Sequence, residues 1–238
     1  MITTVAEHLF DSSQTRRVWQ HIRIDISAEL AEVASYGGFF DVTVGGDPAR
    51  WHPVGASYTA GYADLIAATL DRYHTAEWRI GASLVHLGHA ARLWSPVLAC
   101  VLAHGVIPDL TDLQRADNGA QLRLPEPLGQ RASPSPELLY RVVVQEQMEP
   151  FAAGLRARLA PGLLYGNIAS ALTGSARMLL AARPDLREPI TRLTTGLLET
   201  GELAGSGTVI GPDLGFTRNS CCLYYRIQGG GKCGDCPL

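Results

Sequence analysis

The amino-acid sequence predicts an α+β protein: a mostly helical body with short strands near the N-terminus and mid-chain, and a small cysteine-rich module at the C-terminus. Three observations carry this prediction. The chain has 238 residues, 46% apolar and 18% charged, which is enough to bury a large core. Apolar residues recur at helical spacing through most of the middle of the chain. Four of the five cysteines lie after residue 220.

The first part of the chain combines a helical start with a β-prone, glycine-punctuated stretch. Residues 1–58 hold both, and the Gly-Gly-Asp-Pro sequence at residues 45–48 predicts a turn between short strands. Residues 61–105 follow with apolar positions at helical spacing. Their most apolar stretch, 93–107, is interrupted by polar residues, proline and glycine, and falls short of the roughly 20 residues that a membrane span needs. We therefore expect a buried helix there and no transmembrane segment.

Residues 110–200 are predicted to alternate loops and helices, and the composition changes after Gly201. Pro, Gly and Asp are frequent in residues 110–136, where the alternation over 121–129 predicts a short strand or hairpin. Further helices are expected at 137–159, with a kink or split at Pro150, and at 163–182 and 186–200. Three consecutive valines leave a strand open as the alternative at 142–144. After Gly201 the chain is glycine-rich, the segment CCLYYRI at 221–227 predicts a strand, and 228–238 a tight loop.

This organisation predicts two parts that form one compact unit. Residues 1–205 make the helical body, and residues 206–238 make the C-terminal module. The net charge of -3 does not indicate nucleic-acid binding. The N-terminal sequence lacks the features of a secretory signal, so we expect a cytoplasmic protein. In that reducing compartment clustered cysteines indicate metal or redox chemistry rather than disulfides.

The cysteines of the C-terminal module follow the pattern C-C-x10-C-x2-C, formed by Cys221, Cys222, Cys233 and Cys236. A C-x2-C turn lets two thiolates converge on one metal. Adjacent cysteines would have to close a small, stiff ring around a single ion, whereas structural zinc sites space their ligands by two to four residues. A two-iron cluster accepts vicinal thiolates on separate metals, so the pattern favours a [2Fe-2S] cluster.

Residues around these cysteines suit the same cofactor. Four glycines in residues 229–234 let backbone N–H groups approach cluster sulfurs, which stabilises the reduced cluster. Lys232, the only lysine, and Arg226 would act in the same direction, and Asp235 against them. A zinc ion that ties down the C-terminus and a vicinal disulfide switch remain alternatives. Cys100, alone on an apolar helix, is expected to be a buried small hydrophobe.

The tail SCCLYYRIQGGGKCGDCPL, residues 220–238, closely resembles the C-terminal signature of the siderophore-iron reductases, the FhuF-like ferric reductases. Residues 83–110 and 163–177 are also similar to this family, so the resemblance extends from about residue 55 onward. It implies a cytoplasmic protein, often at the inner face of the membrane, whose [2Fe-2S] cluster reduces ferric iron held by an imported siderophore. The four cluster ligands that it implies are Cys221, Cys222, Cys233 and Cys236.

Side chains beside the cysteines and on the helices are candidates for siderophore contact. Tyr224, Tyr225 and Arg226 adjoin the ligands, although inward packing of alternate residues would explain them equally well. Arg92 and Arg177 lie in the two similar helical stretches and suit an anionic siderophore, while salt bridging is their commoner role. His86 and His89 share one face of a predicted helix, where we expect them to form hydrogen bonds rather than to ligate a metal.

The sequence predicts that the electron comes from another protein, because it contains no dinucleotide-binding or Walker-type motif. A ferredoxin, or a ferredoxin reductase acting through one, is the expected donor. Two other functions stay open: an iron–sulfur electron carrier or sensor, and a zinc-stapled siderophore-binding protein without a redox role. The size of the helical body favours the reductase, because a bulky chelate needs a surface to sit on.

Overall fold

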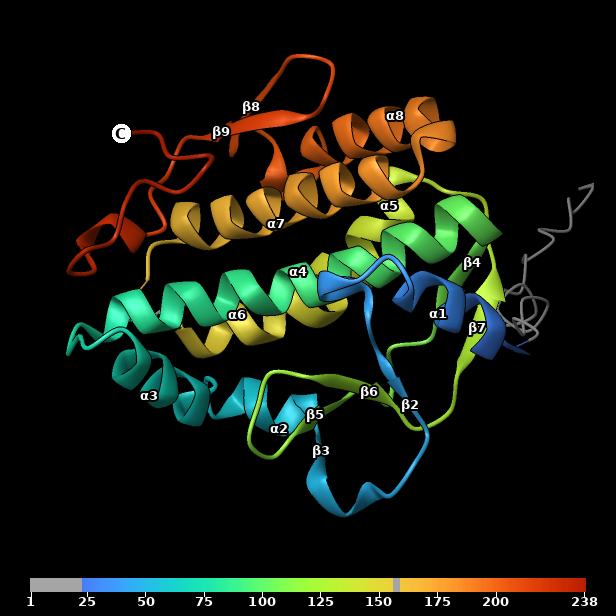
Figure 1. Cartoon of the computed structure of the whole chain (residues 1–238), viewed down its shortest axis with the longest axis horizontal. Coiled ribbons are helices and arrows are strands. Elements are labelled where there is room, and N and C mark those ends of the chain that lie inside the picture. Colours follow the sequence, from blue (N-terminus) through green and yellow to red (C-terminus); the bar gives the residue numbers. More distant parts are fainter. Residues whose placement is uncertain (1–22, 156–158) are drawn as a thin grey trace, which may run out of the picture.

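The computed structural model of the chain describes residues 23–155 and 159–238, and the predicted α+β class is confirmed (Figure 1). The helical start expected in the first part of the chain falls partly on residues 1–22, which lie outside the described residues. The helices are α1 (Ser27–Ala34), α2 (Val54–Thr59), α3 (Ala63–Arg72), α4 (Trp78–His104), α5 (Pro136–Leu139), a π-helical segment (Tyr140–Met148), α6 (Glu149–Leu155), α7 (Pro161–Ala182) and α8 (Arg187–Leu198). The strands are β1 (Ile24–Asp25), β2 (Thr43–Val44), β3 (Trp51–Pro53), β4 (Val106–Pro108), β5 (Gln114–Ala116), β6 (Leu122–Leu124), β7 (Leu128–Arg131), β8 (Gly207–Ile210) and β9 (Gly215–Arg218).

Three small sheets join these strands. One has the order β1-β7-β4 with antiparallel pairs, and the second has the order β2-β6-β5-β3, in which only β2 and β6 run parallel. The predicted turn at residues 45–48 does separate two strands, β2 and β3, yet these strands do not pair with each other because β6 and β5 lie between them. The third sheet is the hairpin β8-β9.

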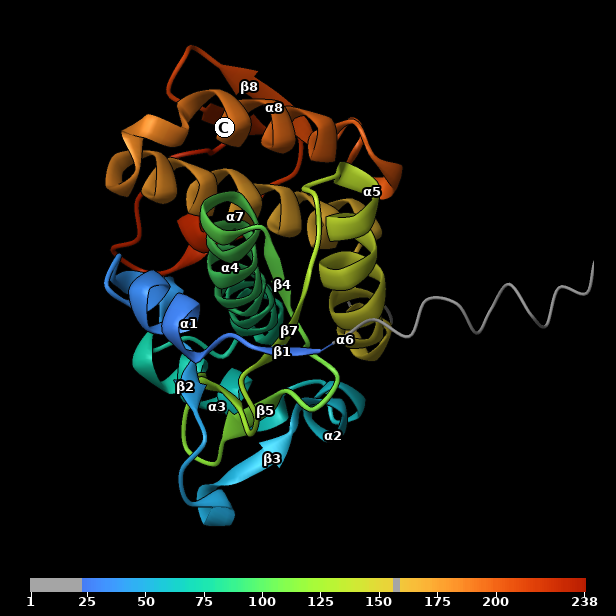
Figure 2. The ribbon, with the colours of Figure 1, turned by 90° about the vertical axis from the view of Figure 1, so that its right-hand side faces the viewer.

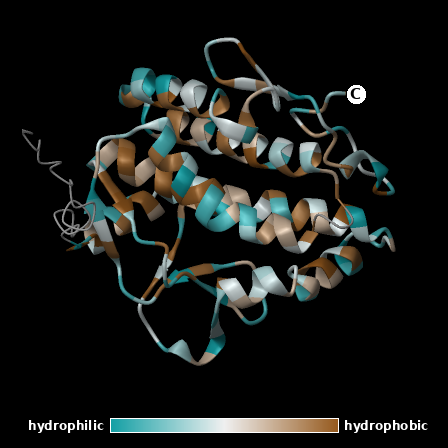
Figure 3. Ribbon diagram, turned by 180° about the vertical axis from the view of Figure 1, so that it is seen from behind, coloured by the Kyte–Doolittle hydropathy of each residue, from teal (hydrophilic) through white to brown (hydrophobic). Residues whose placement is uncertain are grey.

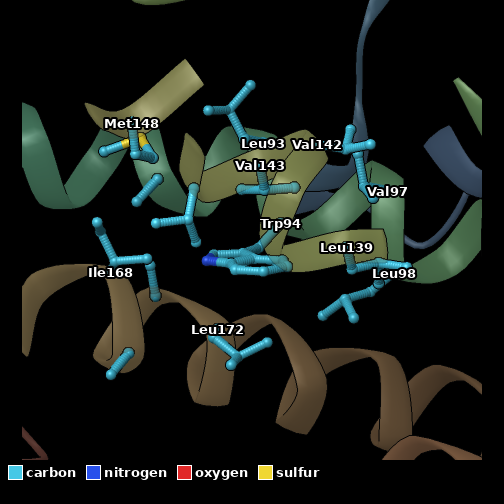
Figure 4. Packing of buried hydrophobic residues seen from close by; sticks show 14 of the residues in the cluster. Leu93, Trp94, Val97, Leu98, Leu139, Val142, Val143, Met148, Ile168 and Leu172 are labelled. Atoms are coloured by element: carbon cyan, nitrogen blue, oxygen red, sulfur yellow. The ribbon is translucent and has the colours of Figure 1, made fainter. Parts of the chain in front are cut away.

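The long helix α4 forms the centre of the molecule. It runs alongside α7, and Figure 2 shows it nearly end-on, with α7 above it and α1 and α6 on opposite sides. Trp94 of α4 is fully buried, and its indole packs between Ile168 and Leu172 of α7 and Val143 of the π-helical segment (Figure 4). Apolar residues are concentrated where these helices meet (Figure 3). This burial explains why the apolar stretch at 93–107 needs no bilayer.

The helical predictions hold, with one change of hydrogen bonding. The strand alternative at 142–144 is wrong, because these valines lie in the π-helical segment and are buried against the core. The change to α-helical hydrogen bonding comes at Glu149, next to Pro150, which cannot donate a backbone hydrogen bond to the preceding turn. The predicted split at Pro150 thus appears as a change of helix type.

The C-terminal module differs from its prediction in two places. The glycine-rich run after Gly201 contains the hairpin β8-β9, and the predicted strand at 221–227 is absent. Leu223 adopts a left-handed conformation with φ of 70°, which ends any extended run, and Tyr224–Arg226 form a 3-10 turn. We call residues 219–238 the cysteine loop. It lies at the end of the molecule where α4 and α7 begin (Figure 1). The boundary after residue 205, between the helical body and the C-terminal module, stays a prediction.

Two buried histidines occupy the core side of α4. His89 lies 2.8 Å from the Tyr58 hydroxyl through Nε2 and 3.3 Å from the Tyr62 hydroxyl through Nδ1. His86 packs against the ring of Phe151, and neither of its ring nitrogens has a hydrogen-bond partner among the described residues. The expected hydrogen-bonding role is confirmed for His89. Burial lowers the pKa of each histidine to about 3.

These two histidines should make the fold acid-labile. Because their pKa falls from 6.5 in the unfolded chain to about 3 in the folded one, the unfolded state binds more protons between these values. The contribution of the two histidines to the free energy of unfolding is therefore fully present above pH 6.5. It is lost as pH falls toward 3, by up to about 1.4 kcal/mol per pH unit for each histidine. Urea unfolding at several pH values should show a shallower acid dependence for His86→Leu than for the wild type. Equal slopes in the two proteins would contradict this assignment.

Candidate metal centre

The backbone of the cysteine loop folds back so that its two cysteine pairs face each other. A turn after β9 presents Cys221 and Cys222, and the 3-10 turn then reverses the chain. Gly230 N–H donates to the Ile227 carbonyl at 2.8 Å, and the preceding Gly229 has φ of 73°, a conformation that favours glycine. The Cys236 N–H donates to the Cys233 carbonyl at 3.1 Å, which closes the C-x2-C turn. This turn brings both of its side chains back toward the vicinal pair.

The four thiols are neighbours of one another. Cys222 is buried, and its Sγ lies 3.5 Å from the Sγ of Cys233. Cys221 is close enough to Cys222 and Cys236 for their charges to raise the pKa of its thiol. Its sulfur accepts a hydrogen bond from the Leu223 N–H at 3.3 Å. Cys221, Cys233 and Cys236 are partly exposed. The centre is therefore anchored at Cys222 and open to solvent along its other side.

The electrostatics of these thiols favour a bound cation. Burial raises the pKa of Cys221, against the lowering effect of the Leu223 hydrogen bond, and Cys222 and Cys236 add to the rise. Burial also raises the pKa of Cys233, and Cys222 and Asp235 act in the same direction. Thiolates gathered in this way repel one another unless a metal neutralises them, and metal coordination deprotonates thiols outright.

The arrangement fits two metal ions better than one. Within the described ranges, no three His, Cys, Asp or Glu side chains converge closely enough to hold a single metal ion. Cys222 and Cys233 have their Sγ atoms 3.5 Å apart, and the charges of Cys222 and Cys236 both raise the pKa of Cys221. A [2Fe-2S] cluster requires four thiolates spread over two irons, so vicinal cysteines can serve different irons. The donor set thus fits the cofactor that the sequence pattern favours.

A buried arginine, Arg218, fastens the cysteine loop to the helical body. Its Nε donates to Asp235 Oδ2 at 2.9 Å, its Nη1 to Asn167 Oδ1 at 2.9 Å, and its backbone N–H binds the Asp235 carbonyl. Asn167 of α7 in turn donates to the carbonyl and hydroxyl of Ser83 on α4. One continuous set of hydrogen bonds therefore joins both central helices to the segment between Cys233 and Cys236.

The carboxylate of Asp235 completes this connection. Burial alone would raise its pKa, but the hydrogen bond to Ser170 of α7 and the charge of Arg218 hold the pKa below its ordinary value. Gly166 allows close approach as well, since a Cβ there would collide with the Ser220 hydroxyl. The sequence-based reasoning missed Arg218, because nothing in its local sequence separates it from the other arginines; its position three residues before Cys221 was the available signal.

The charged residues expected to tune the centre are mostly paired. Arg226 forms an ion pair with Glu77 at the start of α4, with Nη1 2.8 Å from Oε1. Asp235 is paired with Arg218. Lys232 is exposed and donates from Nζ to the Leu238 carbonyl at 2.5 Å. Pairing weakens the electrostatic effect predicted for Arg226 and Asp235, whereas Lys232 keeps the position beside Cys233 on which its prediction rests.

The candidate siderophore contacts lie in different surroundings. The Tyr224 ring packs edge-on against Tyr73, with centroids 6.1 Å apart, while Tyr225 is 46% exposed. Arg92 lies over the Phe39 ring and donates from Nη1 to the Gly88 carbonyl. Arg177 is exposed on α7. Of the tyrosines, therefore, only Tyr225 presents its ring openly to solvent, and Arg92 and Arg177 are not brought together with the cysteines.

The fold and the thiols define a class, a mostly helical α+β protein with a C-terminal iron–sulfur module. Residues 218–238 match the family model of the FhuF 2Fe-2S C-terminal domain. The resemblance to the siderophore-iron reductases is thereby confirmed over these residues, and a [2Fe-2S] cluster is the cofactor of such a domain. No curated protein and no solved structure shows significant similarity to the chain. The match begins at Arg218 and ends at Leu238, so it contains the buried arginine as well as all four cysteines.

Proposed function

We propose that this protein is a ferric-siderophore reductase that delivers one electron to chelated Fe(III). The observation that carries the proposal is the match of residues 218–238 to the FhuF 2Fe-2S C-terminal domain, in a structure where the four thiols are neighbours. Cys221, Cys222, Cys233 and Cys236 would hold the [2Fe-2S] cluster, which supplies one-electron transfer when bound. Siderophores bind iron through hard oxygen donors that suit Fe(III), so a single electron releases the metal as Fe(II).

The exposure of the cysteine loop suits both a substrate and a donor. Cys221, Cys233 and Cys236 are partly exposed, so two different molecules can approach the centre without entering the core. The electron would come from a ferredoxin or a ferredoxin reductase, since the sequence has no nucleotide-binding motif. None of the helices in the described ranges combines the length and apolarity needed to span a bilayer. We place the reaction in the cytoplasm, at the inner face of the membrane where imported chelates arrive.

The reductase activity can be tested anaerobically. Purified protein is chemically reduced, ferric siderophores of the hydroxamate and catecholate types are added, and the visible spectrum and an Fe(II)-specific chelator are followed together. We expect the protein to reoxidise while an equal amount of Fe(II) appears, and we expect redox-inert gallium(III) complexes to leave it reduced. Reoxidation by ferricyanide but by no ferric siderophore would identify a carrier or sensor. Zinc without acid-labile sulfide would identify the zinc-stapled alternative.

Tyr225 provides a test of docking beside the cysteine loop. Because its ring is exposed and adjoins Arg226, Tyr225→Ala should raise the KM for the ferric chelate about fivefold, the loss of about 1 kcal/mol of contact, with the visible spectrum unchanged. Ile210→Ala is the matched control, since Ile210 is an exposed apolar residue on β8. Equal KM values for Tyr225→Ala and wild type would exclude Tyr225 from contact with the chelate.

A further inference from the structure

A groove of about 660 Å³ lies between α4 and α7, which run side by side in Figure 1. We call it the α4–α7 groove. Its lining includes Phe39, Leu87, Ala91, Gly174, Arg177 and Met178. Its volume falls within the range of about 300–1,000 Å³ that is usual for small-molecule sites. The groove is therefore large enough to receive a substantial part of a bulky chelate.

One end of the groove reaches the cysteine loop. Ser170 lines the groove and also shares a hydrogen bond with Asp235, which lies between Cys233 and Cys236. From Ser170 the groove follows α7 to Arg177, seven residues or about 10 Å further along the helix axis. A molecule in this groove would thus extend from the body of the protein to the edge of the centre where the electron leaves.

The apolar lining of the groove is unusually exposed for a folded chain. Phe39 and Met178 are 38% and 40% exposed, although most large apolar side chains of the described part are buried. They come from separate segments, and the Met178 methyl group lies against Gly38, so the 3-10 turn Gly38–Phe40 is held onto α7. Exposed apolar side chains gathered in a hollow indicate a surface that an organic ligand covers.

The charges at the groove limit the kind of ligand. Arg187 is paired with Asp213 at 3.0 Å. Arg177 forms no hydrogen bond or ion pair with any residue in the described ranges. The groove therefore offers the unpaired positive charge of Arg177 beside apolar walls, which suits an organic ligand that carries a negative group.

We propose that the α4–α7 groove is the binding site for the ferric chelate, and that Arg177 receives a negative group of the chelate there. This inference rests on the proposed reductase function, which supplies the occupant. The chelate would lie with its body on Phe39 and Met178, with any negative group at Arg177, and with one edge toward Ser170 and the cysteine loop.

Gly174 allows the groove to be blocked without disturbing the core. A Cβ at Gly174 meets no atom within 4 Å, so Gly174→Trp fills the groove and leaves the rest of the structure in place. Gly55→Trp on α2 is the matched control, because a Cβ there also meets no atom within 4 Å and Gly55 is not part of the groove. Both positions are helical, where replacing glycine does not reduce helix propensity.

Binding is measured by calorimetry with gallium(III) complexes, which cannot be reduced, so that binding is separated from electron transfer. We expect wild type and Gly55→Trp to bind the neutral complex of a cyclic trihydroxamate, and Gly174→Trp to bind it at least about tenfold more weakly. Reoxidation by ferricyanide should be the same in all three proteins, which shows that their cysteine loops are intact.

The outcomes separate this inference from the reductase function. Unchanged affinity and unchanged reduction of the ferric complex in Gly174→Trp would overturn the groove as the binding site and leave the reductase proposal standing. Loss of gallium-complex binding in Gly174→Trp, together with a wild-type protein that reduces no ferric chelate, would support the site and refute the reductase. A change of oligomeric state in Gly174→Trp with unchanged affinity would show that a second copy covers the groove, and would also overturn the inference.

Discussion

Cys222→Ser should yield protein that has lost most of its iron, its acid-labile sulfide and its chelate-reducing activity. Cys222 is the buried member of the four thiols and lies 3.5 Å from Cys233, so it anchors the centre on its core side. A serine hydroxyl is a harder and less acidic ligand than a thiol, and its smaller oxygen would lie short of the metal position. Iron and sulfide analysis and the visible spectrum measure the effect directly.

Cys100→Ala is the control for this prediction. Cys100 is fully buried on α4, and burial raises the pKa of its thiol to about 12, so it behaves as a small apolar side chain. Its replacement should leave iron content, spectrum and activity at wild-type values and cost about 1 kcal/mol of stability through the lost packing. A wild-type spectrum in Cys222→Ser would remove Cys222 from the ligand set, and with it the pairing of Cys222 with Cys233.

The helices could be predicted from the sequence because their signals are local. The expected helix at 163–182 is α7, which begins two residues earlier at Pro161, since proline is favourable at the first helical position. The cysteine pattern was equally informative, because the spacing of ligands restricts the metal that they can share. Cys100 was placed correctly in the core by its apolar neighbours.

The parts that depend on tertiary contacts could not be predicted from the sequence. Residues 221–227 have the composition of a strand. Leu223 nevertheless adopts a left-handed backbone conformation, and its N–H donates a hydrogen bond to Cys221 Sγ. The hairpin β8-β9 could not be predicted, because its glycines weaken the strand propensity of the segment. Packing against α7 holds this hairpin in place. Arg218 has no local pattern that marks it, because its importance comes from the burial of its side chain against α7, where it binds Asn167.

Arg218→Met should detach the cysteine loop from the helical body. Arg218 is 1% exposed, and its guanidinium binds Asp235 and Asn167 at the same time. Removal of one partner from a buried ion pair leaves the other charge without compensation and costs about 3–5 kcal/mol. Asp235 retains some contact with solvent, with 18% of its side chain exposed, so the lower end of that range applies. Because Asp235 lies between Cys233 and Cys236, iron content should fall together with stability.

Three further variants distinguish a specific clamp from a general loss of packing. Arg218→Lys keeps the charge but cannot reach Asp235 and Asn167 together, so its free energy of unfolding should lie between those of wild type and Arg218→Met. Arg192→Met removes an exposed pair with Glu188 and should change stability by less than about 0.5 kcal/mol. Adding Asp235→Asn to Arg218→Met removes the uncompensated carboxylate, so the double variant should recover part of the stability that the single one loses. Urea unfolding and proteolysis of the C-terminal module measure these differences, and additive losses in the double variant would show that Arg218 and Asp235 act separately.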